Sequence, residues 1–183
     1  LFNSLTGLNQ KVGNFPGVTV DKKTGKGKIS ENLSAKIIDL PGMYSLYPKR
    51  GDEWVSYKVL IDEDPNTKID IILLVADASN LKRNLLFCSQ IIDLKRPVVI
   101  ALTMMDIARN KNIQIDVPGL DRELGVLVIE VNPRKNKGML KLNRALESTA
   151  ENHDSLPERD FFQIDELHPE ANNRVQKKTT ALS

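Results

Sequence analysis

Four short stretches of this 183-residue chain combine residue types suited to binding a charged ligand. The most informative is Asp39-Leu40-Pro41-Gly42, which directly follows the apolar run 35–38. A carboxylate at the carboxyl end of a buried strand lies where parallel α/β sheets bind ligands, and such an Asp can help to hold Mg²⁺. Gly42 could present its backbone N–H to a terminal phosphate, because glycine allows close approach. An ordinary Pro-Gly turn at a strand end is the alternative that this tetrapeptide leaves open.

Two of the other stretches could bind opposite ends of a nucleotide. Gly17-Val18-Thr19 could bring the Thr19 hydroxyl and carbonyl to Mg²⁺ and a terminal phosphate, although the same residues suit the start of a strand. In Thr103-Met104-Met105-Asp106, the carboxylate of Asp106 could accept two N–H bonds from a guanine edge. Hydrogen bonds to a charged group contribute roughly 1.5–3 kcal/mol each, enough to select guanine over adenine. The alternative for Asp106 is a carboxylate that stabilises a helix N-terminus.

The fourth stretch is Val131-Asn132-Pro133, which follows the last apolar run of the chain. Because Pro133 has no N–H to donate to a guanine oxygen, Asn132 or Arg134 remains as the donor. In chain order, the four stretches reproduce the second to fifth sequence boxes of a GTPase. Together they are more specific than any one of them.

Apolar periodicity predicts the elements that would position these stretches. Strands are expected at 35–40, 69–77, 97–102 and 126–131, with a Lys- and Gly-rich edge strand within 18–29 that includes a hairpin turn. Helices are expected at 1–8, 53–62, 81–94, 117–125 and 138–151, with Asp52 as one cap and with Trp54 and Tyr57 in the core. This alternation predicts an α/β fold, a doubly wound, mostly parallel sheet with helices on both faces. One further strand is expected upstream of Leu1.

Composition narrows the classes of function. Lys+Arg 26 against Asp+Glu 24 gives a net charge of +2, so no field of one sign favours a nucleic acid partner. The single cysteine, Cys88, excludes an internal disulfide, and its apolar helical context predicts a buried, reduced thiol. No apolar run approaches the ~20 residues of a membrane span, so a cytoplasmic setting is expected, with attachment to a membrane segment outside this chain left open.

Four strings of the sequence resemble the cytoplasmic G domain of the FeoB ferrous iron transporter family, which consists of P-loop GTPases. They are LFNSLTG at 1–7, VGNFPGVTV at 12–20, DLPGMYSL at 39–46 and VADASNLKRNL at 75–85. The resemblance covers about residues 1–150. It implies an N-terminally incomplete GTPase domain at 1–151 and a linker toward a helical regulatory domain at 152–183.

The resemblance also implies roles for the four stretches. Residues 9–19 would form the first switch, 39–52 the second switch, and 103–106 the guanine box. The implied function is binding and slow hydrolysis of GTP to GDP, with Mg²⁺ held by Thr19 and Asp39 and with K⁺ as a further cation. The implied partners are the transmembrane iron-permease part of the same protein, at the cytoplasmic face of the bacterial inner membrane, and the adjacent helical domain. Whether the protein forms an oligomer is left open at the level of sequence.

Three features depart from the usual GTPase pattern. The phosphate loop G-x-x-x-x-G-K-[ST] should lie directly before Leu1, so this polypeptide alone is expected to bind GTP poorly. Thr103 stands where Asn is usual, which would orient the base more loosely. Met43 stands where Ras-like enzymes carry a water-orienting Gln, and Met cannot polarise water. We therefore assign no catalytic side chain, and only the backbone of Gly42 and of the first switch is expected to act.

Two other functions remain open at the level of sequence. One is a regulatory module that senses nucleotide or a partner with little turnover, which the irregular guanine and fifth boxes favour. The other is a ribosome-associated GTPase of the same superfamily, which the near-neutral charge disfavours.

Overall fold

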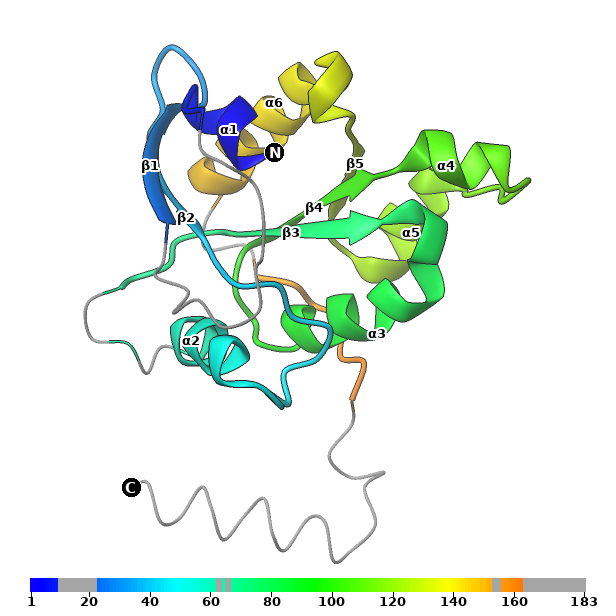
Figure 1. Cartoon of the computed structure of the whole chain (residues 1–183), viewed down its shortest axis with the longest axis horizontal. Coiled ribbons are helices and arrows are strands. Elements are labelled where there is room, and N and C mark those ends of the chain that lie inside the picture. The colour runs from blue at the N-terminus through cyan, green and yellow to red at the C-terminus, as the bar shows by residue number, and fades with distance from the viewer. Residues whose placement is uncertain (10–22, 62–63, 65–66, 153–155, 163–183) are drawn as a thin grey trace, which may run out of the picture.

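The computed structural model describes residues 1–9, 23–61, 64, 67–152 and 156–162 (Figure 1). Strands and helices alternate after an initial hairpin, as the sequence predicts. In chain order the elements are α1 (Phe2–Thr6), β1 (Lys23–Lys28), β2 (Ser34–Asp39), α2 (Gly51–Leu60), β3 (Ile72–Asp77), the 3₁₀ turn η1 (Ala78–Asn80), α3 (Leu81–Ile92), β4 (Val98–Thr103), α4 (Met105–Asn110), α5 (Val117–Leu124), β5 (Leu127–Glu130), η2 (Pro133–Lys135) and α6 (Met139–Glu151).

A three-stranded parallel sheet in the order β3-β4-β5 forms the centre of the fold. Helices α3 and α5 cover one face, and α6 and α1 cover the other (Figure 1). Residues 99–102 of the central strand β4 are at most 1% exposed, because right-handed crossovers place helices on both faces of a parallel sheet. The expected α/β fold with a parallel sheet is confirmed.

Strand β2 differs from its predicted place in that sheet. It pairs antiparallel with β1 in a separate two-stranded sheet, and Ile37 and Ile38 are only partly buried. An apolar run identifies a strand but does not identify its partner. Within the described residues, β3 pairs only with β4, and Val75 in β3 is 49% exposed. The further strand expected upstream of Leu1 stays a prediction.

The glycines of β1 have a packing role, whereas the sequence suggested a turn. A Cβ at Gly27 would collide with the carbonyl oxygen of Leu5, and one at Gly25 would lie 2.7 Å from the Thr6 methyl. Because β1 carries no side chains at these two positions, helix α1 can pack directly on the hairpin.

Helix α2 corrects two smaller expectations. The helix begins at Gly51, two residues earlier than expected, and Asp52 is not its cap. The N–H groups of Lys49 and Arg50, which precede the first turn, donate to the Glu53 carboxylate. Tyr57 packs against the core as predicted, but Trp54 is 49% exposed and meets Tyr57 only edge-on, with ring centroids 5.4 Å apart. The three-residue spacing correctly places Trp54 and Tyr57 on one face of α2, but this face lies at the edge of the hydrophobic core, so only Tyr57 packs against it.

Residues 156–162 lie against the C-terminal end of α3. Lys95 pairs with Asp160 at 2.7 Å, and the carboxylate of Asp93 accepts the N–H groups of Phe161 and Phe162, each at 2.9 Å. This part of the expected linker is thus docked on the domain, while the division at residue 151 stays a prediction. None of the described helices is long and apolar enough to cross a membrane.

Candidate functional site

The Asp39–Gly42 turn begins where β2 ends. Asp39 and Gly42 are exposed to solvent, whereas Pro41 is buried. A Cβ built at Gly42 would have no atom within 4 Å. The backbone at Gly42 is therefore open to a ligand, as the sequence predicted from its residue type.

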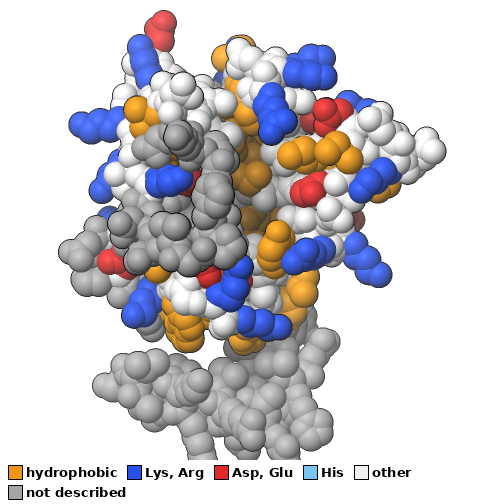
Figure 2. All heavy atoms as spheres, viewed as in Figure 1, with side chains coloured by type: hydrophobic (Ala, Val, Ile, Leu, Met, Phe, Trp, Pro, Cys, Tyr) orange, Lys and Arg blue, Asp and Glu red, His pale blue; other side chains and the backbone are white. Residues whose placement is uncertain are grey.

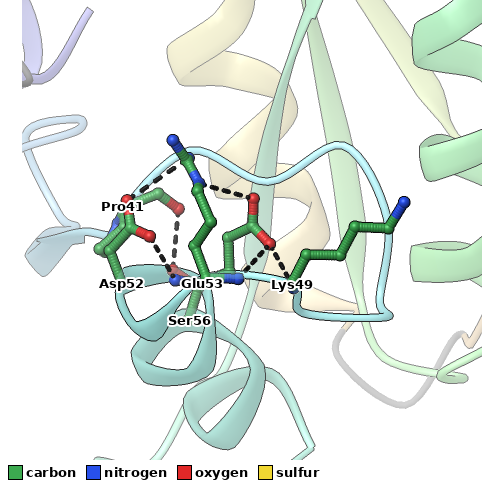
Figure 3. A network of polar contacts seen from close by, with 6 residues as sticks. Pro41, Lys49, Asp52, Glu53 and Ser56 are labelled. Carbon is green, nitrogen blue, oxygen red and sulfur yellow. Dashed lines mark hydrogen bonds and ion pairs between the residues drawn. The ribbon is translucent and has the colours of Figure 1, made fainter. Parts of the chain in front are cut away.

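A buried serine holds this turn from behind. The Ser56 hydroxyl on α2 donates to the carbonyl oxygen of Pro41 at 2.8 Å, and Ser56 is 1% exposed (Figure 3). Met43 is 9% exposed and belongs to the core cluster beneath the parallel sheet. Its side chain therefore packs in the core.

The rest of the second-switch segment is held by α2 and α3. The Leu46 N–H donates to the Gln90 side-chain oxygen at 2.9 Å, and the Arg83 guanidinium lies 3.6 Å from the centroid of the Tyr44 ring. The Glu53 carboxylate binds both backbone N–H groups that precede α2 (Figure 3). The N–H of Lys49, followed by the weaker effects of Arg50, holds the pKa of Glu53 below its ordinary value.

The guanine box joins β4 to α4. Met104 adopts a left-handed conformation with φ +58, and α4 starts at Met105. The Thr103 hydroxyl donates to the carbonyl oxygen of Ala76 in β3 at 3.0 Å, so it links two strand ends. Asp106 is exposed and accepts the N–H of Ile107 at 3.0 Å. Asp106 therefore stabilises its own helix start and also presents its carboxylate to solvent, so both sequence interpretations remain compatible with the structure.

The fifth box is a closed loop after β5. The backbone N–H of Asn132 donates to the Lys137 carbonyl at 2.9 Å, and its side-chain oxygen accepts the N–H of Lys135 at 3.2 Å. This arrangement uses the oxygen of the carboxamide and leaves its NH₂ group as the donor for a ligand. Arg134 is exposed in the same loop. Gly138 closes the loop with φ +76, where a Cβ would collide with the Glu130 carbonyl oxygen.

Asp77 is a structural residue of this edge that the sequence analysis used only as part of a family string. Its carboxylate accepts the Ser79 N–H and hydroxyl, both at 2.8 Å, and the Asn80 amide at 3.1 Å. Burial raises the pKa of Asp77, but the bonds from Ser79 and Asn80 outweigh it and leave the pKa below its ordinary value. An Asp after a strand, followed by Ser and Asn, is a recognisable capping signal.

A second contact that the sequence did not indicate links the elements beside the guanine box and the fifth box, which we call the base-side loops. Arg109 on α4 pairs with Glu130 at the end of β5, with the nitrogen and oxygen 2.8 Å apart. Both side chains are largely exposed, so the pair aligns the two elements without contributing much free energy.

The sheet brings the base-side residues together. Asp77 lies opposite Thr103, and Leu102 lies opposite Glu130, so the guanine and fifth boxes leave neighbouring strands at one edge. Asp39 reaches its place from the separate hairpin. Gly17, Val18 and Thr19 lie outside the described residues.

The described residues provide one candidate Mg²⁺ ligand. They contain no group of three or more His, Cys, Asp or Glu that could hold a metal. A single exposed carboxylate at Asp39 still suits Mg²⁺, which keeps several waters and takes one or two carboxylates together with phosphate oxygens.

A groove of about 470 Å³ lies between α4, the start of α5 and the end of β5, and Met105 is the one residue of the guanine box that lines it. Its lining includes Arg109, Asp116 and Glu130 but none of the candidate nucleotide residues. The candidate nucleotide residues instead follow the carboxyl ends of the strands, where α/β sheets bind ligands.

Comparisons with known proteins identify the family of this chain. Residues 1–146 match the family model FeoB_N, described as ferrous iron transport protein B. The Fe(2+) transporter FeoB of Leptospira biflexa is 44% identical over 146 residues, covering 80% of this chain and 21% of that protein. The Legionella pneumophila transporter of the same name is 45% identical over 150 residues, covering 80% and 19%. This chain therefore spans about a fifth of the length of these relatives.

Solved structures give the same result. The cytosolic domain of L. pneumophila FeoB superposes with a TM-score of 0.76 at 37% identity, covering 100% of this chain and 74% of that one. The FeoB G-domain from Methanococcus jannaschii superposes with a TM-score of 0.68 at 33% identity, covering 82% and 87%.

Proposed function

Because this chain belongs to the FeoB_N family of ferrous iron transport protein B, we propose that it binds and hydrolyses GTP as the G domain of a membrane Fe²⁺ transporter. The observation that carries the proposal is that Asp106, at the start of α4, and Asn132, in the loop after β5, follow the ends of two neighbouring parallel strands, β4 and β5. A carboxylate acceptor and an amide donor placed after neighbouring strands are complementary to the donor and acceptor edge of guanine.

The base is recognised by side chains from both loops. Asp106 accepts two N–H bonds from guanine, and Asn132 or Arg134 donates to its oxygen. The Thr103 hydroxyl does not orient the base directly, because it is bonded to Ala76. Its role is to hold the ends of β3 and β4 in register beneath the base.

The phosphate side is served by the backbone and a metal. Gly42 donates its N–H to the terminal phosphate, and Asp39 holds Mg²⁺, directly or through water, together with Thr19 of the Gly17–Thr19 stretch. Mg²⁺ would neutralise charge on the phosphate oxygens. Because Met43 is in the core, hydrolysis depends on backbone groups and on K⁺ as a further cation.

The intact protein would place this domain at the cytoplasmic face of the bacterial inner membrane. Its partners there are the transmembrane iron-permease part and a helical regulatory domain, reached through residues 152–183 after a G domain at 1–151. On the face shown in Figure 2, Lys and Arg side chains are scattered and not gathered into one patch, so we propose no nucleic acid partner. A regulatory module with little turnover is the second candidate, because the usual Asn of the guanine box is replaced by a Thr that is already bonded.

The deciding experiment is calorimetry on a polypeptide extended upstream to include the expected phosphate loop. We expect Mg²⁺-dependent binding of GTP and GDP and much weaker binding of ATP, whereas the 183-residue chain itself should bind poorly. Equal affinity for GTP and ATP would contradict the guanine assignment. Hydrolysis measured in K⁺ and in Na⁺ then tests the cation, since identical rates would argue against it.

A further inference from the structure

We propose that Ser56 is a positioning residue for the Gly42 N–H, the backbone donor assigned above to the terminal phosphate. The proposal rests on the proposed GTPase function. Ser56 touches no ligand in this role, because it acts through the peptide group between Pro41 and Gly42.

The Ser56 hydroxyl is committed to this one contact. At 1% exposure, Ser56 is the most buried of the polar side chains in the described part of the chain, and its Oγ donates to the Pro41 carbonyl at 2.8 Å (Figure 3). A buried hydroxyl without a partner would cost free energy, so this hydrogen bond is retained whenever α2 is packed.

The acceptor belongs to the same peptide group as the proposed donor. The Pro41 carbonyl and the Gly42 N–H lie in one plane, and no peptide bond in the described chain is cis. Fixing the direction of the carbonyl therefore also fixes the direction of the N–H. Donation to the carbonyl oxygen polarises the amide, which makes its N–H a stronger hydrogen-bond donor.

Burial differs sharply between the two ends of this peptide group. Pro41 is buried against α2, whereas Gly42 is exposed and has open space beside its Cα. Among the described residues, no other hydrogen bond reaches this peptide group. Gln90 and Arg83 hold the same loop further along, at Leu46 and Tyr44, and do not contact the Gly42 amide.

The chain offers a matched control for Ser56. Ser89 on α3 is also buried, at 9% exposure, and its hydroxyl also donates to a backbone carbonyl, that of Leu86 at 2.9 Å. Its acceptor lies within its own helix and outside the turn. Ser56→Ala and Ser89→Ala therefore remove equivalent hydroxyls, but only the first change acts on Gly42.

The first measurement needs no nucleotide. In amide NMR spectra, the Gly42 resonance should move in Ser56→Ala and stay in place in Ser89→Ala. Ser56→Cys, with a weaker donor of similar size, should give an intermediate shift and serves if Ser56→Ala does not fold. An unchanged Gly42 resonance in the folded variants would overturn the proposal, even if the protein bound no GTP.

The second measurement uses the protein that includes the phosphate loop. Ser56→Ala should lower the affinity for a non-hydrolysable GTP analogue about fivefold, since it weakens a hydrogen bond to a charged group without deleting it, and should leave GDP affinity unchanged. Ser89→Ala should change neither affinity. Equal losses for both nucleotides in Ser56→Ala would indicate a packing role and overturn the proposal. A parent protein that binds neither nucleotide would contradict the proposed function instead.

Discussion

The two ends of the proposed nucleotide site are held in different ways. The phosphate-side turn at Asp39–Gly42 follows an antiparallel hairpin and is held by Ser56 of α2, while side chains of α3 hold the loop that continues from it at Tyr44 and Leu46. The base-side loops continue directly from β4 and β5. They are held by the parallel sheet, by their own backbone hydrogen bonds and by the closely packed Gly138.

This difference separates a rigid half of the site from an adjustable half. A loop that is fixed by strand register and backbone contacts has few alternative arrangements. A turn that is held by a few side-chain contacts can be moved by changing them. We therefore expect changes on the base side to affect stability or base choice, and changes on the phosphate side to affect the response to the terminal phosphate.

The largest expected effect on stability is at Gly138. Gly138→Ala combines positive φ with a collision against the Glu130 carbonyl, and should lower the free energy of unfolding by about 3 kcal/mol. Gly7→Ala is the control, because Gly7 has φ +69 but open space, and should cost about 1 kcal/mol. Denaturant unfolding measures both. Equal losses of unfolding free energy in the two variants would mean that the base-side loop can relax around the added methyl group, and the base side would then not be the more rigid half of the site.

Asp106→Ala should have the largest effect on ligand binding. Losing two hydrogen bonds to a charged acceptor should weaken GTP binding by about 3 kcal/mol and leave ATP binding nearly unchanged. Thermal stability should fall only slightly, because Asp106 is exposed and its one hydrogen bond among the described residues is with the Ile107 N–H at the start of α4. Glu123→Ala, an exposed carboxylate on α5, is the control for net charge. Calorimetry with the phosphate-loop-containing protein gives both affinities. Parallel losses for GTP and ATP would contradict the role of Asp106 in base choice.

Thr103→Val tests whether the Thr hydroxyl serves the sheet or the base. Removing the bond to Ala76 should cost about 1 kcal/mol in unfolding free energy and leave the preference for GTP over ATP unchanged. A changed preference at unaltered stability would mean that the hydroxyl contacts the base.

The smallest effect is expected at Asp77 and depends on pH. Because hydrogen bonds from Ser79 and Asn80 lower the pKa of Asp77 in the folded protein, the ionised carboxylate stabilises the fold above its unfolded pKa of about 3.9. That contribution is lost as the pH falls through the folded pKa. Asp77→Asn should therefore be less stable than the parent by up to about 1 kcal/mol at pH 7. The difference should shrink as the pH falls below about 3.9 and vanish once the pH is below the folded pKa, and chemical unfolding over a pH series checks it.

Much of the base side could be predicted from the sequence. The run 97–102 is apolar throughout, so its burial in a parallel strand follows from composition, and Gly125 ends α5 as expected with φ +68. The capping by Asp77 was also available from local sequence. Local sequence places Asp77, Ser79 and Asn80 together, and the structure shows that the carboxylate is the acceptor for the other two.

The phosphate side could not be predicted in the same way. Residues 35–40 were correctly expected to form a strand. Whether that strand joins the parallel sheet or pairs with the preceding strand β1, and how deeply it is buried, depends on packing against α1 and α6 that local periodicity does not encode. The exposure of Trp54 likewise depends on where the margin of the core falls.

The sequence by itself determined the alternation of strands and helices, the family, and which residue types stand at the strand ends, because these follow from local periodicity and from short strings. Only the tertiary structure decided the bonding partners of polar groups that lie far apart in the chain. It directed the Thr103 hydroxyl to Ala76, placed Met43 in the core, and set Ser56 behind the Gly42 peptide group. Hydrogen-bond partners far apart in the chain are selected by packing, and no local pattern encodes them.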